Sequence, residues 1–253
     1  LAVNLNAQTT YYVDAGRSDD DGDGSSWAEA KQYLQSALAL AVEGDEIWVA
    51  KGVYYSNDGC DDDNQRICSF NIPNGVQLYG GFFGNETQLI DREKSDRNED
   101  GIQKEWEFTY PSILSGDIDQ DDPEIIAETW ENISGDNAYN VVTFSNASSE
   151  TVLDGFTITA GGSSNDRDRP SGSYGYGGGI NDKVGGDSNP TVRNCIIQGN
   201  RAYRNGGGIY LANGTFEYCL IKANKSESDG GGVHSTAGSF KFCSFIGNHG
   251  GGG

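Results

Sequence analysis

The chain has 253 residues, and its 38 acidic against 17 basic residues give a formal net charge of −21. This charge excludes nucleic acid and an anionic membrane surface as partners, because both are bound through clustered Lys and Arg. No apolar run is long enough to span a membrane. A carboxylate excess on an aromatic-rich chain is typical of a folded extracellular protein, of a divalent-cation binder, or of both.

The first residues, LAVNLNA, are similar to the end of a secretion signal cleaved after Ala7. An ordinary strand or a frayed arm is the alternative. We therefore expect residues 1–7 to be a signal-peptide remnant, 8–253 to be a single domain, and the protein to be secreted, extracellular or at a cell surface.

An acidic segment, SDDDGDGSS, follows at 18–26. Asp19, Asp21 and Asp23 have the D-x-D-x-D-G spacing that places alternate carboxylates around a Ca²⁺ ion. An EF-hand also needs a Glu at the twelfth loop position, where this chain has Ala30. The spacing thus predicts a calcium turn simpler than an EF-hand, with a solvated acidic loop as the alternative. GDIDQDD (116–122) and CDDDN (60–64) are weaker versions.

One helix is predicted, over residues 26–44. Ser26 and Glu29 form a capping-box pattern and Gly44 supplies a C-terminal stop. Apolar residues recur on one face at spacings of three and four, namely Trp27, Ala30, Leu34, Ala37, Leu38 and Ala41. Such a helix is suited to cover the exposed end of a stack of strands.

Strands are predicted within 45–55, 74–84, 137–146 and 149–159 from their β-branched and aromatic residues. Between the first two, Cys60 and Cys68 flank an acidic stretch. In an oxidising compartment these two cysteines are expected to form a disulfide that closes a small surface loop.

Three segments then repeat with a fixed period: TVRNCIIQGN (191–200), TFEYCLIKAN (215–224) and SFKFCSFIGN (239–248). A fixed period of 20–50 residues predicts a solenoid, in which each repeat buries its apolar face only against its neighbours. The segments are short and β-rich, with no room for crossover helices. The sequence therefore predicts an all-β, parallel β-helix with an N-terminal capping helix, whose clear repeat coils span 177–253.

The alignment gives a column of cysteines, a column of asparagines and a column of charged residues. Cys195, Cys219 and Cys243 are expected to stack as buried thiols, although a metal site that adds His234 or His249 is an alternative. A second column, expected to form a corner ladder in the left-handed conformation, contains Asn200, Asn224 and Asn248. Gly-Gly-Gly triplets at 177–179, 206–208 and 230–232 predict another corner.

The third column, Arg193, Glu217 and Lys241, alternates in sign, which favours cross-strand pairing over a catalytic base. The chain stops at GNHGGGG, in what reads as the opening of another coil. We expect either that the natural protein continues or that the open end docks onto another molecule.

Taken together, these features resemble right-handed parallel β-helix proteins of bacterial surfaces. The similarity lies in residues 11–55, NGVQLYGGFFGNET, SILSGDI and VLDGFTITAGG. The Gly-Gly-Gly-Ile and FEYCLIKAN units resemble the GGA(I/L) and FxxN repeats of chlamydial polymorphic outer membrane proteins. Cys219 stands where FxxN has Asn, so the spacing of the repeat is similar but this residue differs. The resemblance implies a right-handed coil and a secreted protein, but the architecture hosts both adhesins and polysaccharide-cleaving enzymes.

Enzyme signatures are few. No P-loop, dinucleotide fingerprint or Gly-x-Ser-x-Gly elbow is present. Asp154, Asp182 and Asp187 are near surfaces that carry carboxylates in polysaccharide-cleaving β-helices. Tyr174, Tyr176 and Tyr203 are candidate sugar-stacking rings, with packing as the alternative. The leading interpretation is a structural or adhesive surface protein that binds glycans or itself, head to tail, in filaments. A polysaccharide lyase or glycoside hydrolase is the alternative.

Overall fold

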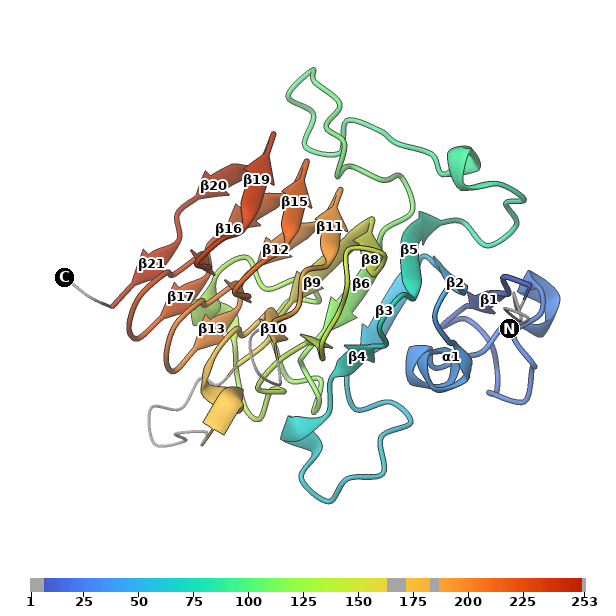
Figure 1. Cartoon of the computed structure of the whole chain (residues 1–253), viewed down its shortest axis with the longest axis horizontal. Helices are drawn as coiled ribbons and strands as arrows, with labels where there is room; N and C mark the ends of the chain where they lie inside the picture. Colours follow the sequence, from blue (N-terminus) through green and yellow to red (C-terminus); the bar gives the residue numbers. More distant parts are fainter. Residues whose placement is uncertain (1–6, 163–171, 183–186, 252–253) are drawn as a thin grey trace, which may run out of the picture.

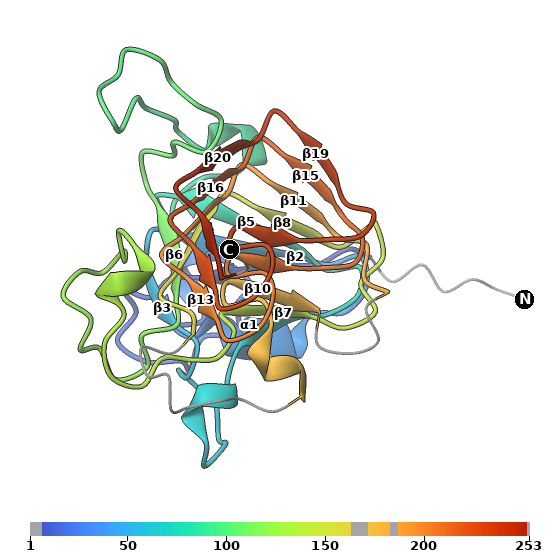
Figure 2. The same cartoon turned by 90° about the vertical axis from the view of Figure 1, so that its left-hand side faces the viewer.

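The computed structural model describes residues 7–162, 172–182 and 187–251. Its strands form four sheets in which every pairing is parallel. Along the chain, successive strands visit sheets A, B and C in turn, and we call one such pass a coil (Figure 1). From β12 onward a short fourth sheet, D, is inserted between B and C. The view in Figure 2 shows the strands of successive coils lying over one another.

Sheet A contains β1 (Thr10–Val13), β2 (Glu46–Ala50), β5 (Gln77–Phe82), β8 (Val152–Asp154), β11 (Thr191–Arg193), β15 (Thr215–Glu217) and β19 (Ser239–Lys241). Sheet B contains β3 (Gly52–Tyr55), β6 (Ser112–Ser115), β9 (Phe156–Thr159), β12 (Ile196–Gln198), β16 (Leu220–Lys222) and β20 (Ser244–Ile246). Sheet C contains β4 (Phe70–Ile72), β7 (Val142–Phe144), β10 (Ile180–Asp182), β14 (Ile209–Tyr210) and β18 (Val233–His234). Sheet D contains β13 (Arg201–Ala202), β17 (Lys225–Ser226) and β21 (His249–Gly250). The 3-10 helices are η1 (Trp27–Glu29), η2 (Gln65–Ile67), η3 (Leu89–Asp91), η4 (Trp130–Asn132) and η5 (Gly172–Gly175).

The register shows that the repeat of the sequence is one coil in space. Thr191 pairs with Thr215, and Thr215 pairs with Ser239, each 24 positions further on. The earlier strand predictions are confirmed as β2 with β3, β5, β7, and β8 with β9. The protein is therefore mostly β, with a solenoid-like stack of parallel strands.

The predicted helix over 26–44 is wrong in its extent. Only α1 (Leu34–Leu40) is α-helical, and a single 3-10 turn, η1, precedes it. Lys31 interrupts the helix because its backbone pairs with β1: its N–H donates to the Tyr12 carbonyl and its carbonyl accepts from the Asp14 N–H. The Asp20 carboxylate then accepts the N–H groups of the next two residues. Tertiary hydrogen bonds thus replace the helical ones.

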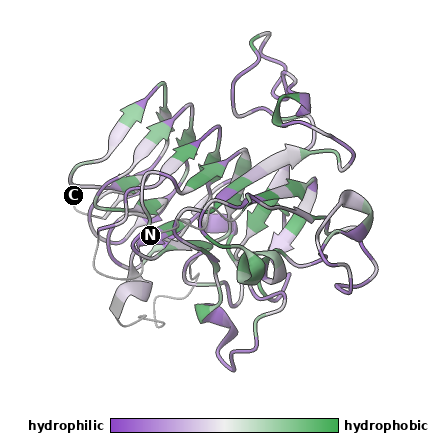
Figure 3. Ribbon diagram, turned by 45° about the vertical axis from the view of Figure 1, so that its right-hand side comes forward, coloured by the Kyte–Doolittle hydropathy of each residue, from purple (hydrophilic) through white to green (hydrophobic). Residues whose placement is uncertain are grey.

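The shortened helix still packs on the end of the core, as predicted. The side chains of Leu34, Ala37 and Leu38 are buried, and α1 contacts β1, β2 and β4. The core continues from there through every coil, and Figure 3 shows apolar strands with polar excursions around them. At the other end, Phe242, Phe245 and Ile246 are 72%, 51% and 58% exposed. The last coil therefore presents apolar side chains to solvent.

The asparagine column is continuous, but its predicted conformation is wrong. Asn200 and Asn224 are fully buried, and the side-chain oxygen of each accepts from the preceding coil. The left-handed residue comes one position earlier, at Gly199 (φ 64°) and Ala223 (φ 51°). That residue turns the chain, and the side chain of the following Asn is buried.

The glycine triplets occupy a corner where coils approach closely. Gly206, the first residue of its triplet, has a φ of 71° and therefore lies in the left-handed region that favours glycine. At Gly207 a Cβ atom would lie 2.3 Å from the Lys225 carbonyl oxygen of the next coil. The triplet therefore combines a turn with backbone contact that a side chain would block.

Candidate functional site

The cysteines divide as the sequence predicts. Cys60 and Cys68 form a disulfide, whereas Cys195, Cys219 and Cys243 are free. The first two of these thiols are buried in the core and the third is half-buried. In the part of the chain that the structure describes, neither His234 nor His249 joins them in a metal-binding group. The column packs in the core.

Only Cys243 is expected to react with a thiol reagent in the native protein. The hydrogen bond with the Cys219 thiol lowers the pKa of Cys243 to about 7, against the effect of burial. Burial raises the pKa of Cys219. Mass spectrometry after brief iodoacetamide treatment near neutral pH should therefore find one alkylated site, and three after unfolding. Comparable labelling of Cys195 in the native state would contradict this expectation.

The predicted calcium turn at Asp19, Asp21 and Asp23 is not assembled. One oxygen of Asp19 accepts the Asp21 N–H at 3.2 Å, and one oxygen of Asp23 accepts the Ser25 N–H at 2.8 Å. These local turns direct the carboxylates at their own backbone. Among the described residues, the three do not form a group of converging ligand atoms.

A different acidic group does converge. One ligand oxygen each from Asp117, Asp121 and Asp122 lies within 4.8 Å of the others, and we call these three residues the Asp117 cluster. They belong to GDIDQDD, in the long connection between β6 and β7. An antiparallel bridge between Asp117 and Asn137 closes this connection at its base. The carboxylates that converge therefore lie in GDIDQDD, a segment that matches the calcium-binding spacing less well than residues 18–26 do.

Burial shapes the electrostatics of the Asp117 cluster. It raises the pKa of Asp122 to about 6, against the hydrogen bond from the Ser134 N–H, and the charge of Asp117 adds to the rise. Burial also raises the pKa values of Asp117 and Asp121. No ion pair among the described residues reaches these three carboxylates.

The charged column on sheet A is longer than predicted. Arg193 Nε lies 2.8 Å from Asp154 Oδ2, and Lys241 Nζ lies 3.0 Å from Glu217 Oε1. Asp154 also pairs with Arg92, which arrives from the connection after β5. A surface cavity of about 430 Å³ lies beside these residues. Because both arginines are held by Asp154, the arrangement is structural and does not offer a catalytic base.

The other residues singled out from the sequence also have structural partners. Asp182 accepts hydrogen bonds from the N–H and hydroxyl of Ser188. The Tyr176 ring packs on Tyr210 with centroids 4.5 Å apart, and the Tyr174 ring packs on Tyr139 at 5.8 Å. Asp187 is exposed.

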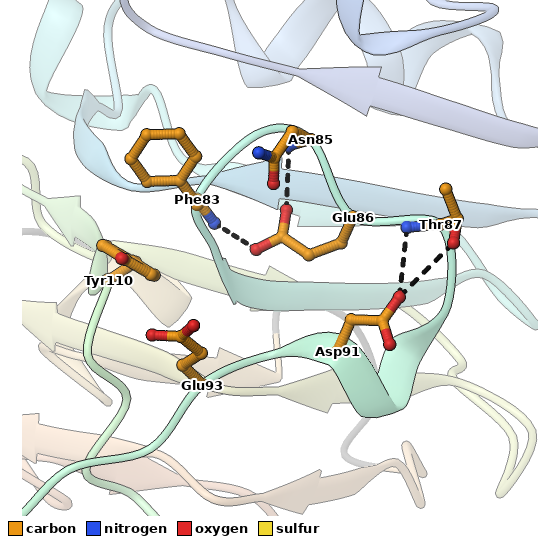
Figure 4. Close-up of a pocket in the computed structure, with 7 residues that line it drawn as sticks. All are labelled: Phe83, Asn85, Glu86, Thr87, Asp91, Glu93 and Tyr110. Atoms are coloured by element: carbon orange, nitrogen blue, oxygen red, sulfur yellow. Dashed lines mark hydrogen bonds between the residues drawn. The ribbon is translucent and has the colours of Figure 1, made fainter.

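A cavity of about 380 Å³ lies beside the loop that follows β5, and Figure 4 shows the residues that line it. Glu86 points back at its own loop, where its two oxygens accept the N–H groups of Phe83, Gly84 and Asn85. Asp91 likewise accepts from Thr87 (Figure 4). Two of the three carboxylates thus hold the loop in shape, so this cavity lacks an available acid–base pair.

The best candidate for ligand binding is a groove of about 320 Å³ over the outer face of sheet B. Its floor comes from β9, β12 and β16, and its walls come from the connections that flank β6. The lining residues, which define the sheet B groove, are Arg97, Asn98, Trp106, Glu107, Ile126, Glu128, Thr157, Ile196, Gln198, Leu220 and Lys222.

The strand pleat explains the floor of the groove. Ile197 and Ile221 are buried in the core, so Ile196 and Leu220, one position earlier, point outward as register partners. One wall is fastened at Ala127, whose N–H donates to Thr159 Oγ1 at 3.1 Å. The Ala127 carbonyl accepts from Gln198 Nε2 at 3.0 Å. Sequence reasoning missed this groove, for which a lone Trp106 in a polar insertion was the available signal.

Comparison with known proteins adds no identification. No family model matches the chain, and neither a curated protein nor a solved structure resembles it. Within residues 7–162, 172–182 and 187–251, no helix has the length and apolar character needed to cross a membrane. The chemistry of the sheet B groove and of the Asp117 cluster therefore carries the functional inference.

Proposed function

We propose that the protein is a secreted, right-handed parallel β-helix that serves as an adhesive scaffold and binds extracellular glycans through the sheet B groove. The cyclic order of the sheets supports the β-helix, and the strong preference of parallel crossovers for right-handed connections supports its hand. The Cys60–Cys68 disulfide supports an oxidising, extracellular location.

The observation that carries the adhesive role is the mixed chemistry of the sheet B groove. Trp106 and the outward-facing Ile196 and Leu220 offer apolar surface, on which the C–H face of a sugar ring packs. Asn98 and Lys222 line the same groove and supply hydrogen-bond donors. An apolar lining with a few polar groups is the usual composition of a small-molecule or glycan site.

The formal charge of −21 narrows the ligand class. Long-range repulsion disfavours highly anionic polysaccharides, so neutral glycans or glycans with isolated carboxylates are expected to bind best. A sparse carboxylate on the ligand would find Arg97 and Lys222 in the groove.

Trp106→Ala is expected to weaken glycan binding about tenfold, because it removes the aromatic platform. The measurement is affinity electrophoresis of the purified chain in gels that contain neutral and acidic polysaccharides. Trp130→Ala is the matched control, since Trp130 is also half-buried but packs on His249 and does not line the groove. Equal affinity losses in the two variants, or no retardation by any glycan, would contradict the proposal.

The same samples discriminate adhesion from catalysis. New reducing ends or unsaturated uronate absorbance, followed over time, would indicate a glycoside hydrolase or a lyase. Glu128 lines the groove as an exposed carboxylate, so it is the first candidate for an acid or base in that case. Product formation that Glu128→Gln abolishes would replace the adhesive scaffold by an enzyme.

A further inference from the structure

The Asp117 cluster places three like charges together, and no basic side chain among the described residues forms an ion pair with them. Asp117 is buried, Asp122 is half-buried and Asp121 is exposed, so water screens the group only from one side. Carboxylates this close repel one another unless a proton or a metal ion lies between them. Asp136 nearby has an arginine partner, Arg66, but that ion pair does not extend to the cluster.

The surrounding backbone is shaped to the cluster. Asp121 donates its N–H to Asp117 Oδ1 at 3.1 Å, and Asp136 donates its N–H to Asp119 Oδ2 at the same distance. Gly135 has a φ of 56°, and a Cβ atom there would lie 2.5 Å from Asp121 Oδ2 and 2.6 Å from Asp119 Oδ2. Glycine suits this position, because the backbone at 135 is left-handed and lies directly against the carboxylates.

A neighbouring amide supplies independent evidence of a ligand. Asn137 is fully buried beside the cluster, and its Nδ2 donates to Asp122 Oδ2 at 3.1 Å and to the Ala160 carbonyl at 2.9 Å. Its Oδ1 atom has no hydrogen-bond partner among the described residues. An unpaired buried amide oxygen is costly, and a bound ion is one of the partners that would satisfy it.

We propose that Asp117, Asp121 and Asp122 bind one Ca²⁺ ion, with the Asn137 amide oxygen as a neutral ligand. All four donors are oxygen, which suits a hard cation and excludes a preference for zinc or copper. Ca²⁺ accepts irregular geometry with several carboxylates, whereas Mg²⁺ demands a near-octahedral site and retains its water. The site differs from the sequence-predicted turn at residues 19–23.

The location gives the ion a structural task. The cluster and Asn137 close the base of the connection between β6 and β7, and Ala127 fastens the same connection to β9 and β12. Ile126 and Glu128, beside Ala127, line the sheet B groove. Bound Ca²⁺ would therefore hold one wall of the groove in place. This last step alone depends on the proposed function.

Isothermal titration of CaCl₂ into the chelator-treated whole chain tests the site. We expect one ion per chain, with a Kd of about 10⁻⁴ to 10⁻³ M, as for extracellular calcium modules. Asp121→Asn is expected to weaken binding at least tenfold, and because Asp121 is exposed the variant should fold normally. Asp21→Asn makes the same charge change in the other acidic loop and should leave the Kd unchanged.

Three outcomes would overturn the proposal: no binding heat with the wild-type chain, equal weakening by the two variants, or equal affinity for Mg²⁺ that added KCl abolishes. The last result would indicate diffuse attraction to an acidic surface. Glycan binding is measured separately, with and without chelator. Calcium binding without glycan binding would leave the site standing and remove only the adhesive role.

Discussion

Asp154→Ala is expected to lower the free energy of unfolding by about 3 kcal/mol, because it leaves the half-buried guanidinium groups of Arg92 and Arg193 without their carboxylate partner. The carboxylate is 1% exposed. It accepts from both terminal nitrogens of Arg92, at 3.2 and 3.4 Å, and from Arg193 Nε at 2.8 Å. Asn194 Nδ2 donates to it at 2.9 Å. Urea unfolding followed by circular dichroism measures the loss.

The pH dependence of this contribution has a definite sign. Burial alone would raise the pKa of Asp154, but Arg92, Asn194 and Arg193 together hold it below the ordinary value of 3.8. The group therefore contributes stability that is present above pH 3.8 and is lost as the pH falls through the lower folded-state pKa. The difference in unfolding free energy between wild type and Asp154→Ala should narrow below that pH.

The matched control for Asp154 is the next acidic residue of the same column. Glu217 pairs with Lys241, whose side chain is 57% exposed, so water replaces the lost partner. Glu217→Ala is expected to cost less than about 1 kcal/mol. Similar losses at the two positions would show that the buried network at Asp154 does not contribute as its geometry implies.

The charged column shows how far the sequence leads. The alternation of Arg193, Glu217 and Lys241 is visible because these residues recur at a fixed period, and periodicity predicts register in parallel strands. The pairing of Arg92 with this column could not be predicted from periodicity. It arrives from a non-repeating connection, and the place where such a connection returns to the sheet depends on tertiary packing.

The same distinction explains the two acidic loops. D-x-D-x-D spacing describes which side chains alternate along a chain, and residues 18–23 and 117–122 both have it in part. Convergence depends on how a second segment meets the loop. Asn137 hydrogen-bonds the Asp117 cluster itself, whereas residues 32 and 33 hydrogen-bond Asp20 and do not bring the other three carboxylates of their loop together. Spacing alone therefore does not distinguish the loop whose carboxylates converge from the loop whose carboxylates do not.

The predicted helix failed for a related reason. Helical periodicity over 26–44 reflects burial of one face, and an extended segment that packs on a core also buries alternate residues. The backbone of Lys31 pairs with β1, and no local signal marks that contact. Repeats, disulfide spacing and strand order were predictable, whereas the sheet B groove and the Asp117 cluster depend on connections that occur once.

Asn224→Ala is expected to cost about 2–4 kcal/mol, since several buried hydrogen bonds are lost at once. The Asn224 side chain is fully buried. Its Oδ1 accepts from the N–H and from the Nδ2 of Asn200, each at 3.0 Å. Its Nδ2 donates to the Ile197 carbonyl at 2.9 Å and to Asn248 Oδ1 at 3.0 Å. Thermal and urea unfolding give the change.

Two further variants separate the hydrogen bonds from simple loss of volume. Asn248→Ala removes the same side chain from the last coil, where water reaches the freed groups, so it should cost about 1 kcal/mol or less. Asn224→Asp keeps the shape and the acceptors but loses the donors that meet the Ile197 carbonyl. Burial without a cation should raise the pKa of the new carboxyl, so stability should recover as the pH falls and the group regains a donor proton. If Asn224→Asp matched wild type at neutral pH, the ladder would contribute packing and not hydrogen bonds to the stack of coils.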